Sequence, residues 1–208
     1  MRGIGGAVVT ALREGDLAVW ASAAEAAPRA SLEAVRAHNA VVEAAQQQHT
    51  PVPLRFGQWL REEAAIRERL AEHAADWRSQ LAAFAGTAEY GVRVVDRGMP
   101  APAQDVRPAP TGTGRAYLEA LAGRENERTR RIAAGQEVAA AIEQALGATV
   151  LRSRVDPLDT AHGLASIAHL VRHSEADAYR AALAAAIAER PELHFLTSGP
   201  WPPHSFAS

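Results

Sequence analysis

The sequence predicts an α+β protein made of two small domains, residues 1–86 and 87–208. Short apolar runs of strand length alternate with helical segments along the whole chain of 208 residues. Two of the helical segments are long and carry apolar residues at alternating spacings of three and four, a pattern typical of coiled-coil-like helices. Only 5% of the residues are aromatic, so we expect cores that are filled mainly by small side chains.

Composition excludes several classes of protein. The chain has 22 cationic and 24 acidic residues, a formal net charge of -2, which is not the balance of a strongly basic nucleic-acid binder. All cations are arginine, so neither a Schiff-base lysine nor a P-loop lysine is present. Without cysteine there is no disulfide, thiolate metal site or cysteine nucleophile. No apolar run reaches the ~18 residues that a membrane-spanning helix needs, so we expect no membrane binding. The near balance of charge leads us to expect no nucleic-acid binding either.

The first domain is expected to begin with a β-hairpin. Residues 7–12 and 17–21 have strand character, and the Arg-Glu-Gly-Asp sequence at 13–16 is a turn signal. A helix follows at about 31–48, with Ser31 as its N-cap.

A compact run, PVPLRFG at residues 51–57, is predicted to be a strand at a sheet edge. Pro51 and Pro53 are two residues apart and therefore remove two donors from one flank of the strand. A central strand would lose two ladder hydrogen bonds, whereas an edge strand would not.

Two long helices are predicted at 58–85 and about 113–147, each with a heptad-like seam. The middle of the second, RENERTRR at 124–131, is wholly polar and cannot lie in a core. We therefore expect this helix to project from its domain, either beside the first as an antiparallel pair or as a separate surface helix.

The second domain has the element order βαββαβ, which is the ferredoxin-like order. Its expected elements are a strand at 89–95, a proline-rich linker at 98–114, the long helix, a strand at 149–155, a turn at 156–157, a strand at 164–171, a helix at 174–190 and a strand at 193–197.

The chain ends in GPWPPHSFAS. Its prolines favour an extended conformation and hold Trp201 and Phe206 as stiff apolar anchors. These anchors either dock on the body of the protein itself or are presented to a partner. Eight residues of this tail and of the proline-marked strand are candidates for protein binding: Pro51, Pro53, Arg55, Phe56, Trp201, Pro202, Pro203 and Phe206.

Four segments resemble the GvpL/GvpF family of gas vesicle proteins. The most specific is GPWPPHSF at 199–206, which is similar to the family signature GPWPPYSF. His38 followed by PVPLRFG, the run EYGVRV at 89–94, and GTGRAYL at 112–118 resemble further family segments in the same order. His204 departs from the pattern, because the family has a tyrosine there.

This resemblance implies a cytoplasmic accessory protein of gas vesicle formation that associates with the small hydrophobic shell protein and with other vesicle proteins. It also implies a tyrosine-rich first strand that has no counterpart here, so the first sheet is expected to lack one strand.

Residue patterns give no catalytic, cofactor or metal site. His169 and His173 are four apart, but on a strand this spacing spans about 13 Å, too far for one ion. The leading function is therefore a non-enzymatic assembly factor. The alternatives are a self-associating coiled-coil adaptor without shell contact and a small-ligand enzyme on a ferredoxin-like scaffold.

Overall fold

The computed structural model describes residues 1–96, 98, 114–158, 160 and 162–207. The chain divides into two compact units, Met1–Glu89 with Pro200–Ser208, and Tyr90–Gly199. The predicted linker at 98–114 falls almost entirely outside the described residues. The tail, which the sequence places in the second domain, groups with the first unit, where Ser205 is hydrogen-bonded to Glu89.

The first unit opens with the predicted hairpin. After a short 3-10 helix, β1 (Val9–Glu14) and β2 (Leu17–Ser22) pair antiparallel, with Val9 opposite Ser22 and Glu14 opposite Leu17. Gly15 takes the positive φ of 59° that closes the turn. Both strands are thus confirmed, the first of them two residues later than expected.

The predicted helix at 31–48 is α1 (Leu32–Gln46), and its cap is confirmed. The Ser31 hydroxyl accepts a hydrogen bond from the Ala34 N–H at 3.1 Å, which satisfies one of the donors that a helix start leaves free. Ala34 and Val42 are buried, so α1 contributes one narrow apolar stripe to a small core.

The predicted edge strand at 51–57 is wrong. These residues form no strand and pair with none in the described chain. Pro53 is buried, and the Leu54 carbonyl is hydrogen-bonded to His38 and not to a neighbouring strand. The segment is irregular up to Arg55 and turns at Phe56 and Gly57.

The single helix predicted at 58–85 is also wrong. Two helices take its place, α2 (Glu63–Glu72) and α3 (Ala74–Phe84), and they meet at His73, whose ψ of 20° is not helical. Arg67, a polar position of the predicted seam, donates hydrogen bonds to Glu63 and to the carbonyl of Arg13. This part of α2 therefore packs against the hairpin and not against a second long helix.

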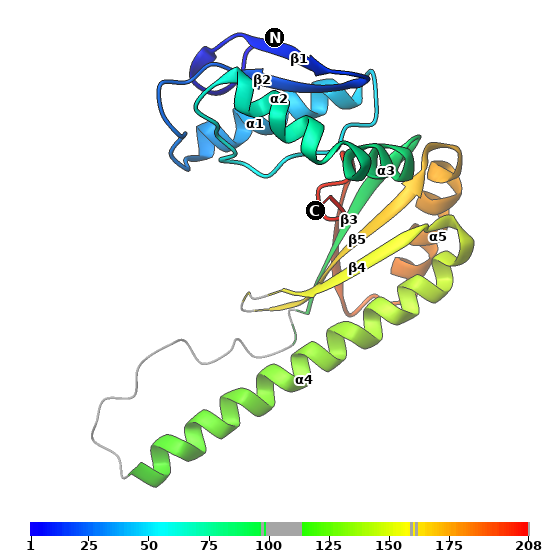
Figure 1. The fold of residues 1–208 in the computed structure, drawn as a ribbon. Helices are drawn as coiled ribbons and strands as arrows, with labels where there is room; N and C mark the ends of the chain where they lie inside the picture. The colour runs from blue at the N-terminus through cyan, green and yellow to red at the C-terminus, as the bar shows by residue number, and fades with distance from the viewer. Residues whose placement is uncertain (97, 99–113, 159, 161, 208) are drawn as a thin grey trace. The chain divides into compact units, whose positions relative to one another are not determined.

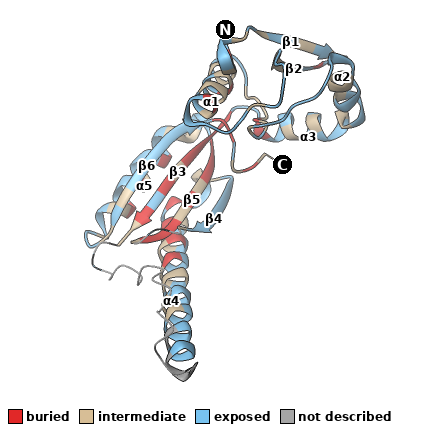
Figure 2. Ribbon diagram, turned by 90° about the vertical axis from the view of Figure 1, so that its left-hand side faces the viewer, coloured by how far each residue is buried: buried red, intermediate tan, exposed pale blue. Residues whose placement is uncertain are grey.

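The second unit contains a four-stranded sheet in the order β4-β5-β3-β6. Figures 1 and 2 show two helices on the same face of this sheet. Its elements are β3 (Thr87–Val95), α4 (Gly114–Leu146), β4 (Arg152–Pro157), β5 (Gly163–Arg172), α5 (Ala176–Ala188) and β6 (His194–Trp201).

The elements of this unit agree with the predicted βαββαβ order, but their bounds differ: the strand predicted at 149–155 is β4 (Arg152–Pro157), and the strand predicted at 193–197 is β6 and continues to Trp201. β4 runs antiparallel to β5 through Pro157, so the chain reverses after residue 157 and not at 156–157. The proline is tolerated because β4 is an edge strand, and β6, which includes Pro200, lies at the other edge.

Among the residues of α4 whose side chains are described, the buried ones all lie in the second half of the helix. Ala139, Ile142 and Leu146 face the core with spacings of three and four, whereas Leu118 and Leu121 are exposed. Figure 2 shows the exposed half extending beyond the sheet of its unit, as the polar middle of this helix predicted.

Candidate protein-binding surface

The C-terminal tail is held by a buried carboxylate. Glu89, 8% exposed, accepts hydrogen bonds from the Ser205 N–H and the Ser205 hydroxyl, both at 2.7 Å. Such charge-assisted bonds are the strong ones in proteins. The tail also folds on itself, because the His204 N–H donates to the Pro202 carbonyl at 2.7 Å and the Ala207 N–H to that of Pro203 at 3.0 Å.

Helix α1 holds the irregular run at 51–57 through one histidine. His38 Nε2 lies 3.0 Å from the carbonyl oxygen of Leu54, and the His38 ring packs edge-on against Phe56 with centroids 5.8 Å apart. This hydrogen bond and ring contact replace the ladder bonds that a strand would have made.

Electrostatics connect the tail to the same helix. Burial lowers the pKa of His204, and the nearby His38 lowers it further, whereas Glu89 and Glu43 act in the opposite direction. The fold therefore gathers α1, the start of β3 and the tail into one cluster, which we call the tail cluster: His38, Glu43, Leu54, Phe56, Glu89, His204 and Ser205.

The eight sequence-predicted residues differ in how much surface they offer. Pro53, Pro202, Pro203 and Phe206 are buried, and Pro51 and Phe56 are half-buried. Only Arg55 and Trp201 are exposed, the indole at 40%. The tail thus follows both of the alternatives that the sequence left open, because Phe206 docks on the unit while Trp201 remains accessible.

Sequence reasoning missed Glu89 as the anchor of the tail. The available signal was a lone carboxylate in the otherwise uncharged start of a strand, Thr-Ala-Glu-Tyr-Gly. A charge at a buried strand position needs a hydrogen-bonding partner, but the local pattern does not say that this partner lies 116 residues away.

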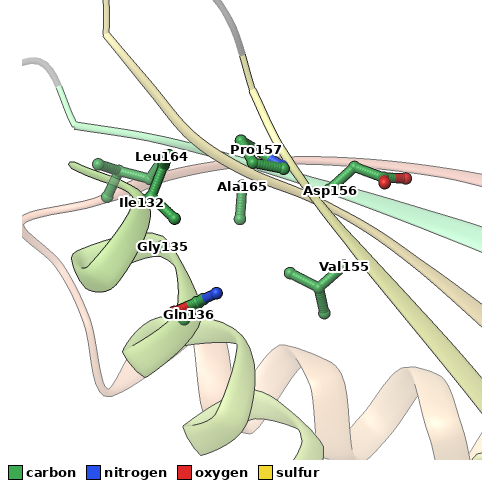
Figure 3. A pocket seen from close by; sticks show the side chains of 8 residues that line it. All are labelled: Ile132, Gly135, Gln136, Val155, Asp156, Pro157, Leu164 and Ala165. Atoms are coloured by element: carbon green, nitrogen blue, oxygen red, sulfur yellow. The ribbon is translucent and has the colours of Figure 1, made fainter. Parts of the chain in front are cut away.

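Two hollows lie in the second unit. The first, between α4 and strands β4 and β5, has a volume of about 50 Å³ and is lined by residues such as Gly135 and Leu164 (Figure 3). The second, about 320 Å³, is an open groove along α5 beside Arg180 and Ser198. Only the second reaches the lower end of the volumes typical of small-molecule pockets, about 300–1,000 Å³.

Among the described residues, no three His, Asp or Glu side chains come together as a metal site would require. None of the helices in the described part of the chain is both long and apolar enough to cross a membrane.

Solved structures share this fold. The structure of gas vesicle protein GvpF from Microcystis aeruginosa matches with a TM-score of 0.76 at 16% identity, covering 100% of this chain and 92% of that one. The GvpF structure from Anabaena sp. PCC7120 matches with a TM-score of 0.75, also at 16% identity, covering 100% and 91%. The chain therefore has the GvpF-like fold, a mixed α/β architecture with antiparallel sheets.

Sequence comparison adds the family. The chain belongs to the family "Gas vesicle synthesis protein GvpL/GvpF", whose sequence profile matches residues 1–208. Gas vesicle protein L from Streptomyces sp. (strain CB03234) is 29% identical over 228 aligned residues, which cover 99% of this chain and 85% of that protein. The resemblance found in the sequence motifs is thereby confirmed.

Proposed function

We propose that this protein is a cytoplasmic accessory protein of gas vesicle assembly that binds the small hydrophobic shell protein and other vesicle proteins. The observation that carries the proposal is the match of the GvpL/GvpF family over residues 1–208. A hydrophobic partner that assembles into a shell has to be kept from premature aggregation, and a binding protein that covers apolar surface does this.

The C-terminal tail supports a location for this contact. Trp201 is an exposed indole followed by two buried prolines, so its backbone is held rigid and little entropy is lost when a partner covers it. Rigid aromatic side chains of this kind are frequent hot spots of protein interfaces. Arg55, the other exposed candidate, would contribute a polar contact at the rim.

The test is capture of the shell protein by the tagged chain when both are produced together. Replacing Trp201 by alanine should reduce capture by about 30-fold if the indole is a hot spot worth about 2 kcal/mol. Leu32→Ala is the matched control, because Leu32 is an exposed apolar residue of the same unit, 67% exposed, but lies on α1 and not in the C-terminal tail.

The outcomes separate two statements. If the wild-type chain fails to retain the shell protein, the proposed function is wrong. If Trp201→Ala retains it as well as the wild type does, the function stands but the tail is not the contact. Equal loss in Trp201→Ala and Leu32→Ala would indicate a nonspecific apolar interaction.

A second candidate is a coiled-coil adaptor that associates with itself through α4. The exposed half of α4 favours it, since Tyr117, Leu118 and Leu121 are 48%, 64% and 39% exposed. The break at His73 argues against a coiled coil, because the long helix predicted at 58–85, which would have paired with α4, is divided into α2 and α3. Light scattering on the wild type and on the double variant Leu118→Glu with Leu121→Glu tests this candidate. An adaptor is expected to be a dimer as wild type and a monomer as the variant. A monomeric wild type would show that the candidate is wrong.

We also propose that residues 87–201 form a ferredoxin-like unit, which is the predicted second domain without the last residues of its tail. The support is the order βαββαβ together with the strand order β4-β5-β3-β6. Cleavage at a protease site introduced into the segment before α4 should give two fragments that stay associated. The reason is that β3 would be in one fragment and its neighbours β5 and β6 in the other.

A further inference from the structure

The four-stranded sheet of the second unit has one face without a helix of its own unit in the described chain. Both α4 and α5 pack on the other face, as Figures 1 and 2 agree. We call the helix-free side the open face. Side chains alternate between the two faces of a sheet along each strand. Knowing the face of one residue in a strand therefore assigns every other residue of that strand to a face.

Contacts with the helices place one residue in each of three strands. Tyr90 of β3 packs on Tyr179 of α5, with ring centroids 4.8 Å apart. His169 of β5 lies 2.9 Å from the Tyr179 hydroxyl, and Ser153 of β4 is hydrogen-bonded to Glu143 of α4. These three strand residues lie on the helix side, so their immediate neighbours lie on the open face.

Which residues of β6 belong to the open face follows from a contact with the neighbouring strand β3. A Cβ built on Gly91 of β3 would lie 2.7 Å from the Ser198 hydroxyl, so the two residues share a side of the sheet. Because Gly91 follows Tyr90, that side is the open face.

Small side chains from three adjacent strands cover the centre of the open face: Gly91, Ser166, Ala168 and Ser198. Leu164 and Leu170, the β5 positions of this face on either side of Ser166 and Ala168, are buried. Arginines flank this small-residue floor on two strands, with Arg93 on β3 and with Arg152 and Arg154 on β4, all three exposed.

The charge of this face is predominantly positive. Among the described strand positions that alternation assigns to it, the charged residues are Arg93, Arg152, Arg154 and Arg172 against Glu89 and Asp156. Asp156 is paired with Arg154 at 2.8 Å, so these two residues together add no net charge to the face, and the Glu89 oxygens accept the two bonds from Ser205. The face therefore differs in sign from the whole chain, whose net charge is -2.

The spacing of the arginines suits a segment of protein. Strands β3 and β4 are separated by β5, so Arg93 on β3 and the two arginines of β4 lie on strands about 10 Å apart. A polypeptide segment of about 10 Å in diameter, lying over Ser166 and Ala168 of β5, would have Arg93 on one side and Arg152 and Arg154 on the other.

The positive charge of the open face indicates that a segment bound there is acidic. We propose that the open face binds an acidic segment of a partner protein, which lies along β5 between the arginines of β3 and β4. Nucleic acid is disfavoured because sheets that read single-stranded RNA stack bases on aromatic rings, and the strand positions of this face hold no Phe, Tyr or Trp. The inference rests on the proposed partner-binding function and names the chemistry of one partner.

A labelled peptide of repeated Glu and Ala residues is the probe, with fluorescence anisotropy as the measurement. Binding to the full chain should be detectable at about 50 mM salt and weaken strongly at about 300 mM. The double variant Arg93→Glu with Arg154→Glu should bind at least about 10-fold more weakly. The matched control is Arg128→Glu with Arg130→Glu on the exposed half of α4, which makes the same change in net charge and should bind as the wild type does.

Circular dichroism and thermal melting establish that both double variants fold. Absence of peptide binding, or equal weakening in both, would overturn the inference. Tighter binding of a single-stranded oligonucleotide through the same two arginines would also overturn it, in favour of a nucleic-acid surface. Failure of the peptide with intact capture of the shell protein leaves the proposed function in place, so the two can fail separately.

Discussion

Glu89 and Ser205, 116 residues apart in sequence, form a two-point hydrogen-bonded pair in which one buried carboxylate accepts both the N–H and the hydroxyl of the serine. The pair anchors the C-terminal tail to the start of β3. Beside it, Pro202, Pro203 and Phe206 are buried, whereas Trp201 remains exposed.

The first prediction concerns this pair. Glu89→Gln should lower the free energy of unfolding by about 1–3 kcal/mol, because an amide is a weaker acceptor and its NH2 group can face the Ser205 N–H. Ser205→Ala should have a smaller effect, since the backbone bond survives. Chemical denaturation measures both, and a Glu89→Gln protein as stable as the wild type would show that the pair contributes nothing.

The second prediction divides the tail into a packed and an exposed part. Phe206→Ala should destabilise by about 3 kcal/mol because it empties a buried site, whereas Trp201→Ala should change stability by less than about 1 kcal/mol. Thermal melting of the two variants side by side is the measurement. A larger loss for Trp201→Ala would mean that the indole is buried in solution.

The third prediction concerns acid stability. His169 is fully buried beside Tyr179, and burial lowers its pKa from 6.5 to about 4, against a smaller opposing effect of Glu143. Its neutral form is favoured in the fold, so its contribution is complete above pH 6.5 and is lost as the pH falls towards 4.

This contribution amounts to about 3 kcal/mol over that interval. Urea unfolding measured across it should show stability falling with pH, and His169→Gln should flatten this dependence while keeping a side chain able to bond to Tyr179. An unchanged slope in the variant would assign the acid sensitivity to other groups.

The fourth prediction uses two glycines of α4. A Cβ on Gly135 would lie 2.4 Å from the Leu164 carbonyl oxygen, whereas one on Gly123 would meet nothing within 4 Å. Gly123→Ala should therefore stabilise the helix by up to about 1 kcal/mol, through propensity alone. Gly135→Ala should destabilise by about 1–3 kcal/mol, because α4 has to move away from β5. Opposite signs in melting temperature are expected, and stabilisation by both would contradict the close approach.

Local patterns predicted most of the elements of this protein. The hairpin, the Ser31 cap, the long helix α4 and the order of the second unit all depend on side chains within a few turns of one another, and the structure contains them. The two failures have long-range causes. Residues 51–57 have strand-like composition but are held by His38, and Arg67 in the predicted seam instead binds at the hairpin.

The sequence by itself determined the class of the chain, through the rare GPWPPHSF string at 199–206, and the type of nearly every element, through periodicity. Tertiary structure alone decided that Phe206 is packed while Trp201 is available, that Glu89 holds Ser205, and that arginines from β3 and β4 share one face. The physical reason is distance along the chain. Periodicity records which side of an element is apolar, whereas a buried carboxylate or a shared sheet face depends on segments that meet only when the whole chain has folded.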